Sequence, residues 1–273
     1  SVYVYCPPEP NFSSSTECQG DPTVFTDNSN PGAHPSAAIV SWNWTMNGNG
    51  SYVGGTTNTS TNPQYLFDTC DTYYVTLEVT DANGCINSII IPVVVDCNPT
   101  ADFDAPPVCF DNLPVLFSNN STNGSGNINQ WIWDMGDNGA GSYVGGTNST
   151  SINPHYTFDT CGIFNVRLIV IDNNGCRDTI IKTVEVYCEP TASFTYQEEC
   201  VEDTTFFSST STSPGNIIEW EWNMGDGGTG TYVGGTSNSD ENPQYIYQDC
   251  GVYYVTLIIA DDNGCNDTIQ DSV

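Results

Sequence analysis

Positive charge is scarce in this sequence. Its 273 residues include 3 Lys and Arg against 33 Asp and Glu, which gives a formal net charge of −30. Nucleic-acid binding and docking to anionic lipid both depend on basic side chains, so the composition excludes nucleic acid and anionic membrane surfaces as partners. The acidity has two interpretations: it keeps the chain soluble and self-repelling, or it binds cations such as Ca²⁺, to which carboxylate and carbonyl oxygens are suited.

Long apolar runs and zinc motifs are absent as well. No stretch of about 18 apolar residues occurs, so no membrane insertion is expected. The sequence has no Cys-x-x-Cys pair and only 2 histidines, which leaves too few ligands at the required spacing for a zinc site.

Cysteines, by contrast, are plentiful and evenly spaced. The 12 cysteines form four series with nearly equal steps along the chain. These series are Cys6, Cys97 and Cys188; Cys18, Cys109 and Cys200; Cys70, Cys161 and Cys250; and Cys85, Cys176 and Cys265. Self-similarity at a fixed period predicts a tandem array, here of three copies.

The cysteine steps also place the domain boundaries. We expect residues 1–6 to be the end of a preceding repeat's last strand, followed by repeats at 7–97, 98–188 and 189–273, the third with an incomplete last strand. Two interpretations are open. The chain is a segment of a longer covalent array, or it is a subunit whose last strand is completed by the first strand of the next chain through β-strand addition.

Each copy has the length and pattern of one small β-sandwich. In the second copy, alternating apolar and polar residues predict strands at 99–108, 115–118, 130–135, 155–158, 164–171 and 178–187. Asn-Gly before the last strand of each copy is a strong hairpin signal, because both central residues of a type I′ turn need positive φ. No helical periodicity is present, so the sequence predicts an all-β protein.

An even number of regularly spaced cysteines predicts disulfides and an oxidising, extracellular location. Cys97 and Cys109 flank the predicted strand 99–108, and about 12 residues at roughly 3.3 Å each span more than a disulfide can bridge. Cys161 and Cys176 are excluded as a pair for the same reason. In a Greek-key sandwich this leaves one bridge at each end of every copy. The predicted pairs are Cys6–Cys85, Cys18–Cys70, Cys97–Cys176, Cys109–Cys161, Cys188–Cys265 and Cys200–Cys250. A crossed alternative, with the ends assigned the other way and Cys109 bonded to Cys176, stays open.

One motif gives the copies a family resemblance. The second copy has Trp-Ile-Trp-Asp-Met at 131–135, Gly-Asp-Asn-Gly at 136–139, Asn-Pro at 153–154 and Asp-Asn-Asn-Gly at 172–175. This order of motifs resembles the polycystic kidney disease (PKD) domain, and the third copy shares most of it. The first copy departs from the pattern, because residues 45–50 have lost both acidic positions.

The resemblance implies a fold class and a setting. It implies an all-β protein of three tandem immunoglobulin-like (PKD-type) β-sandwiches in an elongated array, of the kind found in extracellular and cell-surface proteins. Tandem copies resemble the stalks of microbial surface adhesins or the accessory modules of secreted hydrolases. Cysteine-rich copies resemble parts of large secreted bacterial surface proteins.

Several aspartates have two interpretations. Those of the Gly-Asp-x-Gly segment either cap a tight turn or hold a cation. Others are expected at the joint between copies, where Ca²⁺ would stiffen the array. The candidate ligands are Asp102, Asp104, Asp134, Asp137, Asp172 and Asp226. No cofactor is required by the sequence, and Ca²⁺ is the cation that it suggests.

A further segment, Ser/Thr-Tyr-Val-Gly-Gly-Thr, recurs once per copy and carries Tyr52, Tyr143 and Tyr232. Its Gly-Gly either makes a hairpin turn, or the segment presents a repeated contact surface to a neighbouring filament or a glycan.

Two functions remain. An enzyme is not expected, because a repeated active site would need its histidines or basic residues in every copy. The first function is a disulfide-stapled stalk or filament segment of an extracellular adhesin or fibre, whose partners are further repeats of the same array or neighbouring subunits. The second is a polysaccharide- or ligand-binding accessory module of a secreted protein.

Overall fold

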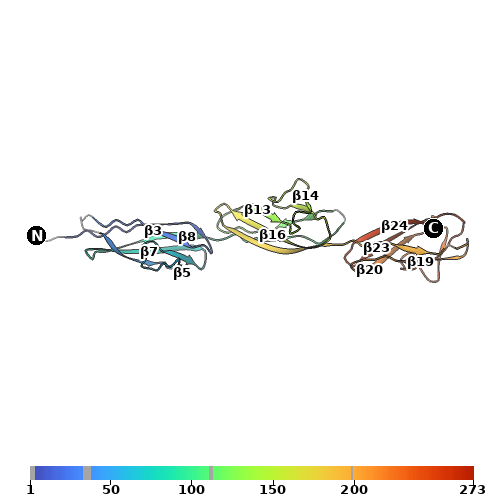
Figure 1. The fold of residues 1–273 in the computed structure, drawn as a ribbon, viewed down its shortest axis with the longest axis horizontal. Coiled ribbons are helices and arrows are strands. Elements are labelled where there is room, and N and C mark those ends of the chain that lie inside the picture. The colour runs from blue at the N-terminus through green and yellow to red at the C-terminus, as the bar shows by residue number, and fades with distance from the viewer. Residues whose placement is uncertain (1–3, 33–37, 111–112, 198) are drawn as a thin grey trace. The chain divides into compact units, whose positions relative to one another are not determined.

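The computed structural model describes residues 4–32, 38–110, 113–197 and 199–273 as an all-β protein (Figure 1). Residues 1–3, which belong to the predicted strand end 1–6, lie outside the described residues. Across the described ranges, no helix is long and apolar enough to cross a membrane.

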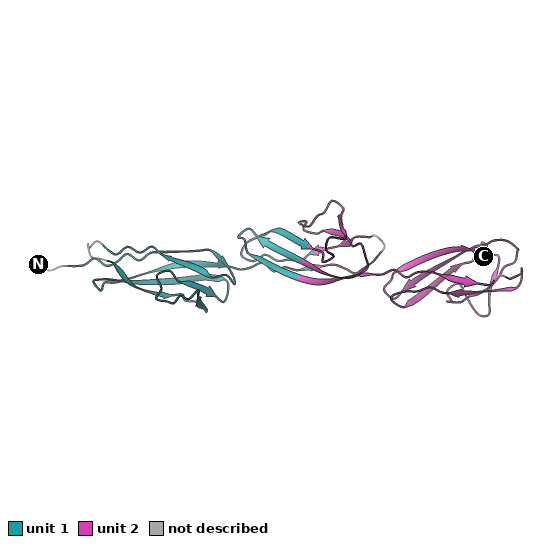
Figure 2. Cartoon of the chain, in the orientation of Figure 1, with its two compact units in different colours: residues 1–103, 119–133, 168–180 teal, residues 104–118, 134–167, 181–273 magenta. Residues whose placement is uncertain are grey.

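The chain forms two compact units (Figure 2). The first comprises residues 1–103, 119–133 and 168–180, and the second comprises residues 104–118, 134–167 and 181–273. The first unit thus contains the whole first repeat and one part of the second, and the second unit contains the other part and the whole third repeat. Each transition from one repeat to the next therefore lies inside one unit.

The first repeat is a sandwich of two four-stranded sheets. One sheet has the order β1-β3-β6-β5, and the other has the order β2-β8-β7-β4. The strands are β1 (Phe12–Ser14), β2 (Glu17–Cys18), β3 (Thr23–Asp27), β4 (Ile39–Thr45), β5 (Gly50–Val53), β6 (Gln64–Phe67), β7 (Asp71–Asp81) and β8 (Ile86–Asp96).

The alternation read in the sequence forms the core of this sandwich. Val75, Leu77 and Val79 of β7 are fully buried, whereas the residues between them point away from the core. Trp44 and Met46, two residues apart on the β4 side, are buried with them. Burial of about 1.5–3 kcal/mol per large apolar side chain holds the two sheets together.

The second repeat contains β9 (Phe103–Asp104), β10 (Val108–Cys109), β11 (Val115–Leu116), β12 (Ser118–Asn119), β13 (Ile128–Asp134), β14 (Ser142–Val144), β15 (His155–Thr157), β16 (Gly162–Asp172) and β17 (Arg177–Tyr187). The third contains β18 (Phe194–Tyr196), β19 (Thr204–Ser209), β20 (Ile217–Asn223), β21 (Thr231–Val233), β22 (Gln244–Ile246), β23 (Tyr254–Asp261) and β24 (Asn266–Ser272). Its sheets have the orders β18-β19-β22-β21 and β20-β23-β24, so the second sheet has three strands.

The predicted strand at 99–108 is broken in the structure. It forms β9, which pairs with β12, and β10, which runs parallel to β17. Pro106 and Pro107 lie between them, and proline has no N–H for a sheet ladder. The first repeat divides its first strand in the same way, with β1 antiparallel to β3 and β2 parallel to β8. This division carries the chain from one sheet to the other.

The predicted hairpins before the last strand of each repeat are present, but their turns are not of type I′. Gly84, Gly175 and Gly264 have positive φ, whereas the asparagine before each does not. A buried aspartate orders each turn instead: Asp81, Asp172 or Asp261 accepts backbone N–H bonds through one carboxylate oxygen. Each turn therefore presents its cysteine in a fixed position.

Candidate functional site: the joints between repeats

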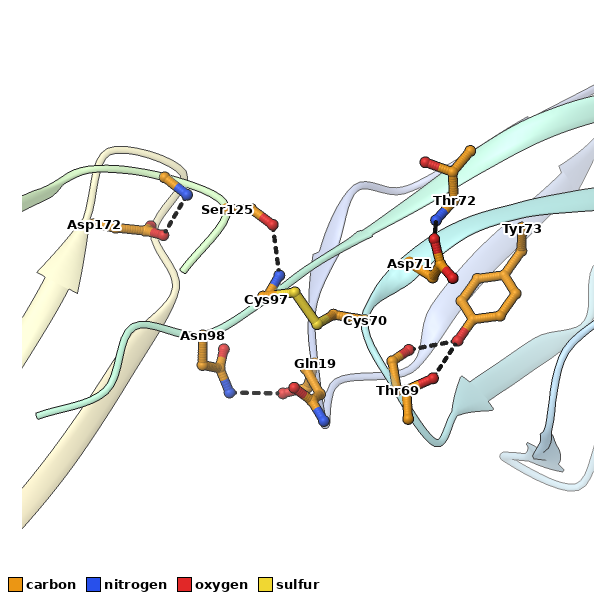
Figure 3. The surroundings of a disulfide bond; sticks show 11 residues. Gln19, Thr69, Cys70, Asp71, Thr72, Tyr73, Cys97, Asn98, Ser125 and Asp172 are labelled. Carbon is orange, nitrogen blue, oxygen red and sulfur yellow. Dashed lines mark hydrogen bonds between the residues drawn. A yellow bond between two sulfur atoms is a disulfide. The ribbon is translucent and has the colours of Figure 1, made fainter. Parts of the chain in front are cut away.

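Three cysteines gather where the first repeat ends. Cys97 directly follows β8, and Cys70 directly precedes β7, whose first residue Asp71 pairs with Val95 near the end of β8. Cys18 ends β2, which runs parallel to β8 with Cys18 beside Asp96. Cys70 and Cys97 form a disulfide, which ties the end of the last strand to the neighbouring turn (Figure 3).

The third cysteine forms a bond that crosses the joint. Cys18 is bonded to Cys176, which lies in the turn between β16 and β17 of the second repeat. Cys176 is 1% exposed, and its backbone N–H donates to Oδ1 of Asp172 at 2.9 Å. The buried turn thus holds this cysteine toward the first repeat, and a covalent bond joins two successive repeats.

The next joint repeats this arrangement. Cys161 is bonded to Cys188 within the second repeat, and Cys109 is bonded across the joint to Cys265. Cys109 of β10 lies beside Tyr187 of β17, just as Cys18 of β2 lies beside Asp96 of β8. Cys265 is also 1% exposed, with its N–H donated to the aspartate of its turn. The two joints are therefore built from equivalent cysteines.

Hydrogen bonds also fasten the chain where it passes from the first repeat to the second (Figure 3). The N–H of Cys97 donates to Oγ of Ser125 at 2.8 Å, and the N–H of Ser125 donates to the carbonyl of Cys97 at 3.0 Å. Asn98 donates its side-chain amide to the carbonyl of Gln19 at 3.0 Å. A Cβ on Gly124 would overlap the backbone carbonyl oxygens of Cys97 and Asn98, so only glycine fits there. The sequence prediction did not include these residues.

The predicted disulfide pairs are wrong. Eight of the cysteines do form disulfides, but with other partners. We predicted Cys18–Cys70, Cys97–Cys176, Cys109–Cys161 and Cys188–Cys265. The structure has Cys18–Cys176, Cys70–Cys97, Cys109–Cys265 and Cys161–Cys188. The predicted boundaries end a repeat at Cys97 and at Cys188, but the predicted pairing grouped each of these cysteines with the repeat that follows. In the structure each directly follows the last strand of its own repeat, β8 or β17, and bonds to the cysteine before β7 or β16. The crossed alternative Cys109–Cys176 is also absent.

The remaining two predicted pairs, Cys6–Cys85 and Cys200–Cys250, are not formed either. All four of these cysteines are free thiols, with Cys85 half-buried and the other three exposed. They are the equivalents, in the first and third repeats, of cysteines that take part in the two joints.

The aspartates of the Gly-Asp-x-Gly segment cap turns. Asp137 accepts the N–H groups of Gly139 and Gly141 and the hydroxyl of Tyr156, the last at 2.6 Å. Burial favours the neutral acid, but these hydrogen bonds outweigh it and lower the pKa of Asp137. Asp226 has the same environment, with Tyr245 as the hydroxyl donor at 2.7 Å and a lowered pKa. In the first repeat, Tyr65 donates to the carbonyl of Gly48 instead.

The other predicted cation ligands are dispersed among different interactions. Asp134 forms an ion pair with Arg167 at 3.0 Å, and Asp104 lies 3.8 Å from Lys182. Asp172 caps its turn, and the backbone of Asp102 bonds with Ser121. Among the described residues, no group of three or more His, Cys, Asp or Glu side chains could hold a metal ion. Ca²⁺ binding stays a prediction.

The repeated tyrosines lie half-buried on a hairpin. Tyr52 and Tyr232 donate their hydroxyls to the carbonyls of Trp44 and Trp222. Each of the three rings packs edge-on against the tyrosine of the neighbouring strand. Burial, and then the charge of Asp137, raises the pKa of Tyr143 to about 12. The predicted contact surface, which needs these rings at the surface, stays a prediction.

This fold and these joints define the class of protein: tandem immunoglobulin-like β-sandwiches that are joined by disulfides. The PKD domain family matches residues 96–188 and 187–273, which is more than half of the chain. The chain belongs to the PKD domain family.

One relative and two solved structures are similar to parts of this chain. A pre-pro-metalloprotease, PrtV of Vibrio cholerae, is 29% identical over 162 residues, which cover 58% of this chain and 16% of the relative. The chain thus spans a small part of that protein's length. The PKD1 domain of Vibrio anguillarum Epp is 26% identical and covers 33% of this chain and 95% of its own, with a TM-score of 0.27. The PKD1 domain of the PrtV protease is 29% identical over 31% of this chain and 94% of its own, with a TM-score of 0.26. PKD domains with four disulfides make this chain an extracellular accessory or structural module.

Proposed function

We propose that this chain is a mechanical segment of an extracellular stalk or filament, such as that of a cell-surface adhesin, and that it has no catalytic role. The observation that carries the proposal is the pair of disulfides Cys18–Cys176 and Cys109–Cys265, each of which bonds one repeat to the next. A disulfide within a repeat is enough to stabilise that repeat alone. A disulfide between two repeats also prevents them from separating when the chain is pulled, which is what a stalk or filament requires.

The charge of the chain supports the same function. A net charge of −30 makes neighbouring repeats repel one another, and salt screens this repulsion only partly over the short distance across a joint. A disulfide keeps the joint closed whatever the ionic strength. A bridge over 158 residues also restricts the unfolded chain, which stabilises the folded state by about 5 kcal/mol in the chain-entropy relation.

The disulfides predict how far the chain extends under force. The two bonds across the joints span overlapping segments, so the shortest covalent path from end to end contains about 90 residues, or about 300 Å at full extension. The experiment is single-molecule stretching between the termini of the oxidised chain, with Cys6, Cys85, Cys200 and Cys250 replaced by serine. A full extension of about 300 Å supports the proposal.

A matched pair of variants makes the test specific. Replacing the four cysteines of Cys18–Cys176 and Cys109–Cys265 by serine should lengthen the shortest path to about 220 residues, or about 750 Å. Replacing those of Cys70–Cys97 and Cys161–Cys188 should leave the extension at about 300 Å, because the bonds across the joints remain. If the reference chain, which keeps all eight bonded cysteines, extends as far as the first variant, the proposed function is contradicted.

A further inference from the structure

We propose that the third repeat binds a neutral, extended β-1,4-linked polysaccharide on the outer face of the sheet β18-β19-β22-β21, where the ring of Phe206 stacks on a sugar ring. The inference goes beyond the proposed mechanical function, because a stalk segment needs no ligand of its own.

An exposed aromatic ring marks the site. In β19, Thr205 and Phe207 are buried, whereas Phe206 between them is 48% exposed on the outer face of the sheet. Phe206 lines a groove of about 420 Å³, which is in the size range of ligand sites in proteins. The other outward-facing residues that line this groove are Thr195, Gln197 and Ser208.

The side chains around the ring are polar but uncharged. Thr195 of β18 pairs with Ser208, and Phe206 pairs with Gln244 of β22. The four strands of this sheet contain no charged residue, whereas every strand of the other sheet in this repeat contains an acidic one. This face therefore offers hydroxyl and amide groups to a neutral ligand and has no charge with which to bind an ionic one.

Several of these groups have hydrogen-bonding capacity to spare. The hydroxyl of Thr195 and the side-chain amides of Gln197 and Gln244 make no hydrogen bond to another described residue. An amide both donates and accepts, and so does a hydroxyl. The hydroxyls of a ligand can thus bind here without breaking a bond within the protein.

The recurring Tyr-Val-Gly-Gly-Thr segment shapes the same face. Val233 of β21 pairs with Gln244, and Gly234 follows Val233. A Cβ on Gly234 would overlap Oε1 of Gln244, so the glycine leaves the space in which this amide lies. Gly54 leaves the same space for Gln64 in the first repeat. The segment thus holds a polar group beside the position of the ring before any ligand binds, which reduces the entropy that binding costs.

The equivalents of Phe206 distinguish the third repeat from the other two. Val24 and Leu116 occupy the same position, and each pairs with the residue that corresponds to Gln244. They are 40% and 49% exposed, so the position faces outward in every repeat. Its residue is aromatic in the third repeat and aliphatic in the first two. The ring is therefore the group that makes the third repeat the binding one.

The chemistry of the ring and of its neighbours defines the ligand class. The face of an aromatic ring is negative, and it attracts weakly positive C–H groups. A β-linked pyranose presents such C–H groups on its flat faces and hydroxyls around its rim. A β-1,4-linked chain is also extended, which fits an open sheet face. An acidic polysaccharide would be repelled by the net charge of −30.

Titration of the full oxidised chain, followed by nuclear magnetic resonance, tests the site. The neutral probes are cellohexaose and chitohexaose, and β-1,4-linked hexaglucuronic acid is the matched acidic probe. We expect the neutral probes to shift the amide signals of Thr195, Gln197, Phe206 and Ser208 equally at low and high salt, since no ion pair forms. The acidic probe should leave these signals unchanged.

Substitutions at the central position make the test specific. Phe206→Leu introduces the residue type that the second repeat has there, so the fold should be kept while the affinity for the neutral probes falls at least tenfold. Phe206→Trp should keep the affinity. Leu116→Val is the matched control and should change nothing. Val24→Phe should double the number of probe molecules bound per chain.

The inference is overturned if neither neutral probe binds, if the acidic probe binds as well as they do, or if Phe206→Leu leaves the affinity unchanged. It is also overturned if Val24→Phe adds no site, because the ring would then not be the deciding group. Stretching of the same chain measures the disulfides across the joints and not this face, so the proposed function is tested separately.

Discussion

Single polar side chains fix the turns on which this fold depends. Asp226 accepts the N–H groups of Gly228 and Gly230 and the hydroxyl of Tyr245, so its ionised form has at least three donors. Hydrogen bonds to a charged acceptor are stronger than those to a neutral one. In the second repeat, Asp137 likewise accepts the hydroxyl of Tyr156. In the first repeat, the corresponding tyrosine, Tyr65, donates to the backbone carbonyl of Gly48 and not to a carboxylate. The turn is thus acid-dependent in two repeats of three.

This difference predicts a pH-dependent effect of Asp226→Asn. The pKa of Asp226 is lowered in the folded state, so its stabilisation is present above the unfolded value near 4 and is lost as the pH falls through the lower folded value. At pH 7 the substitution should reduce hydrogen-exchange protection of Gly228 and Gly230 by about tenfold, equivalent to ~1.4 kcal/mol. The difference between the variant and the native chain should shrink as the pH is lowered from 7 through the folded pKa of Asp226.

The matched control is Asp203→Asn, since Asp203 is exposed on the surface of the same repeat. It should leave the protection of Gly228 and Gly230 unchanged at every pH. An Asp226→Asn effect that does not shrink as the pH is lowered would show that the side chain acts by shape rather than by charge.

At the scale of elements, the paired strands explain why the joints are where they are. β2 runs parallel to the end of β8 and β10 to the end of β17, so that Cys18 lies beside Asp96 and Cys109 lies beside Tyr187. Each of these two cysteines then bonds to the cysteine in a turn of the following repeat, Cys176 or Cys265. The backbone passes from one repeat to the next at Cys97–Asn98, where it is held by Ser125 and Gln19.

Gly124→Ala tests this close contact. The new Cβ would overlap the carbonyl oxygens of Cys97 and Asn98, which are backbone atoms and cannot turn away. We expect hydrogen-exchange protection of the Cys97 and Ser125 amides to fall at least tenfold, while the amides of β4 and β7 keep theirs. Gly251→Ala is the control, because its Cβ would meet only side-chain atoms of Tyr253 at 3.8 Å or more. Unchanged protection at Cys97 and Ser125 would refute a tight joint.

The elements themselves could be predicted from the sequence, and the pairing of cysteines could not. Alternation predicted the strands that became β13, β16 and β17, because a half-buried strand exposes every second residue to water. Trp133 and Met135, two residues apart, are both buried, which fits the same alternation. Disulfide pairing depends on which of two neighbouring domains a cysteine faces, and local sequence contains no signal for that choice. Cys97 follows one strand and precedes another, and the predicted pairing grouped it with the strand that follows, whereas it bonds to Cys70 of its own repeat.

For the whole molecule, the disulfides make a chain of repeats into one covalent network. Cys18–Cys176 and Cys109–Cys265 overlap in sequence, so each encloses part of the second repeat and all three repeats are linked. Reduction should therefore loosen the joints as well as the sandwiches. The same rule of pairing leaves Cys6, Cys85, Cys200 and Cys250 as free thiols.

The central claim is that disulfides cross the joints, and non-reducing peptide mapping tests it most directly. A protease that cleaves at Asp and Glu suits a chain with 33 acidic and 3 basic residues. Mass spectrometry of the digest should find Cys18 linked to Cys176 and Cys109 linked to Cys265. Peptides that link Cys18 to Cys70 and Cys109 to Cys161 would contradict the account, because every bond would then lie within a single repeat.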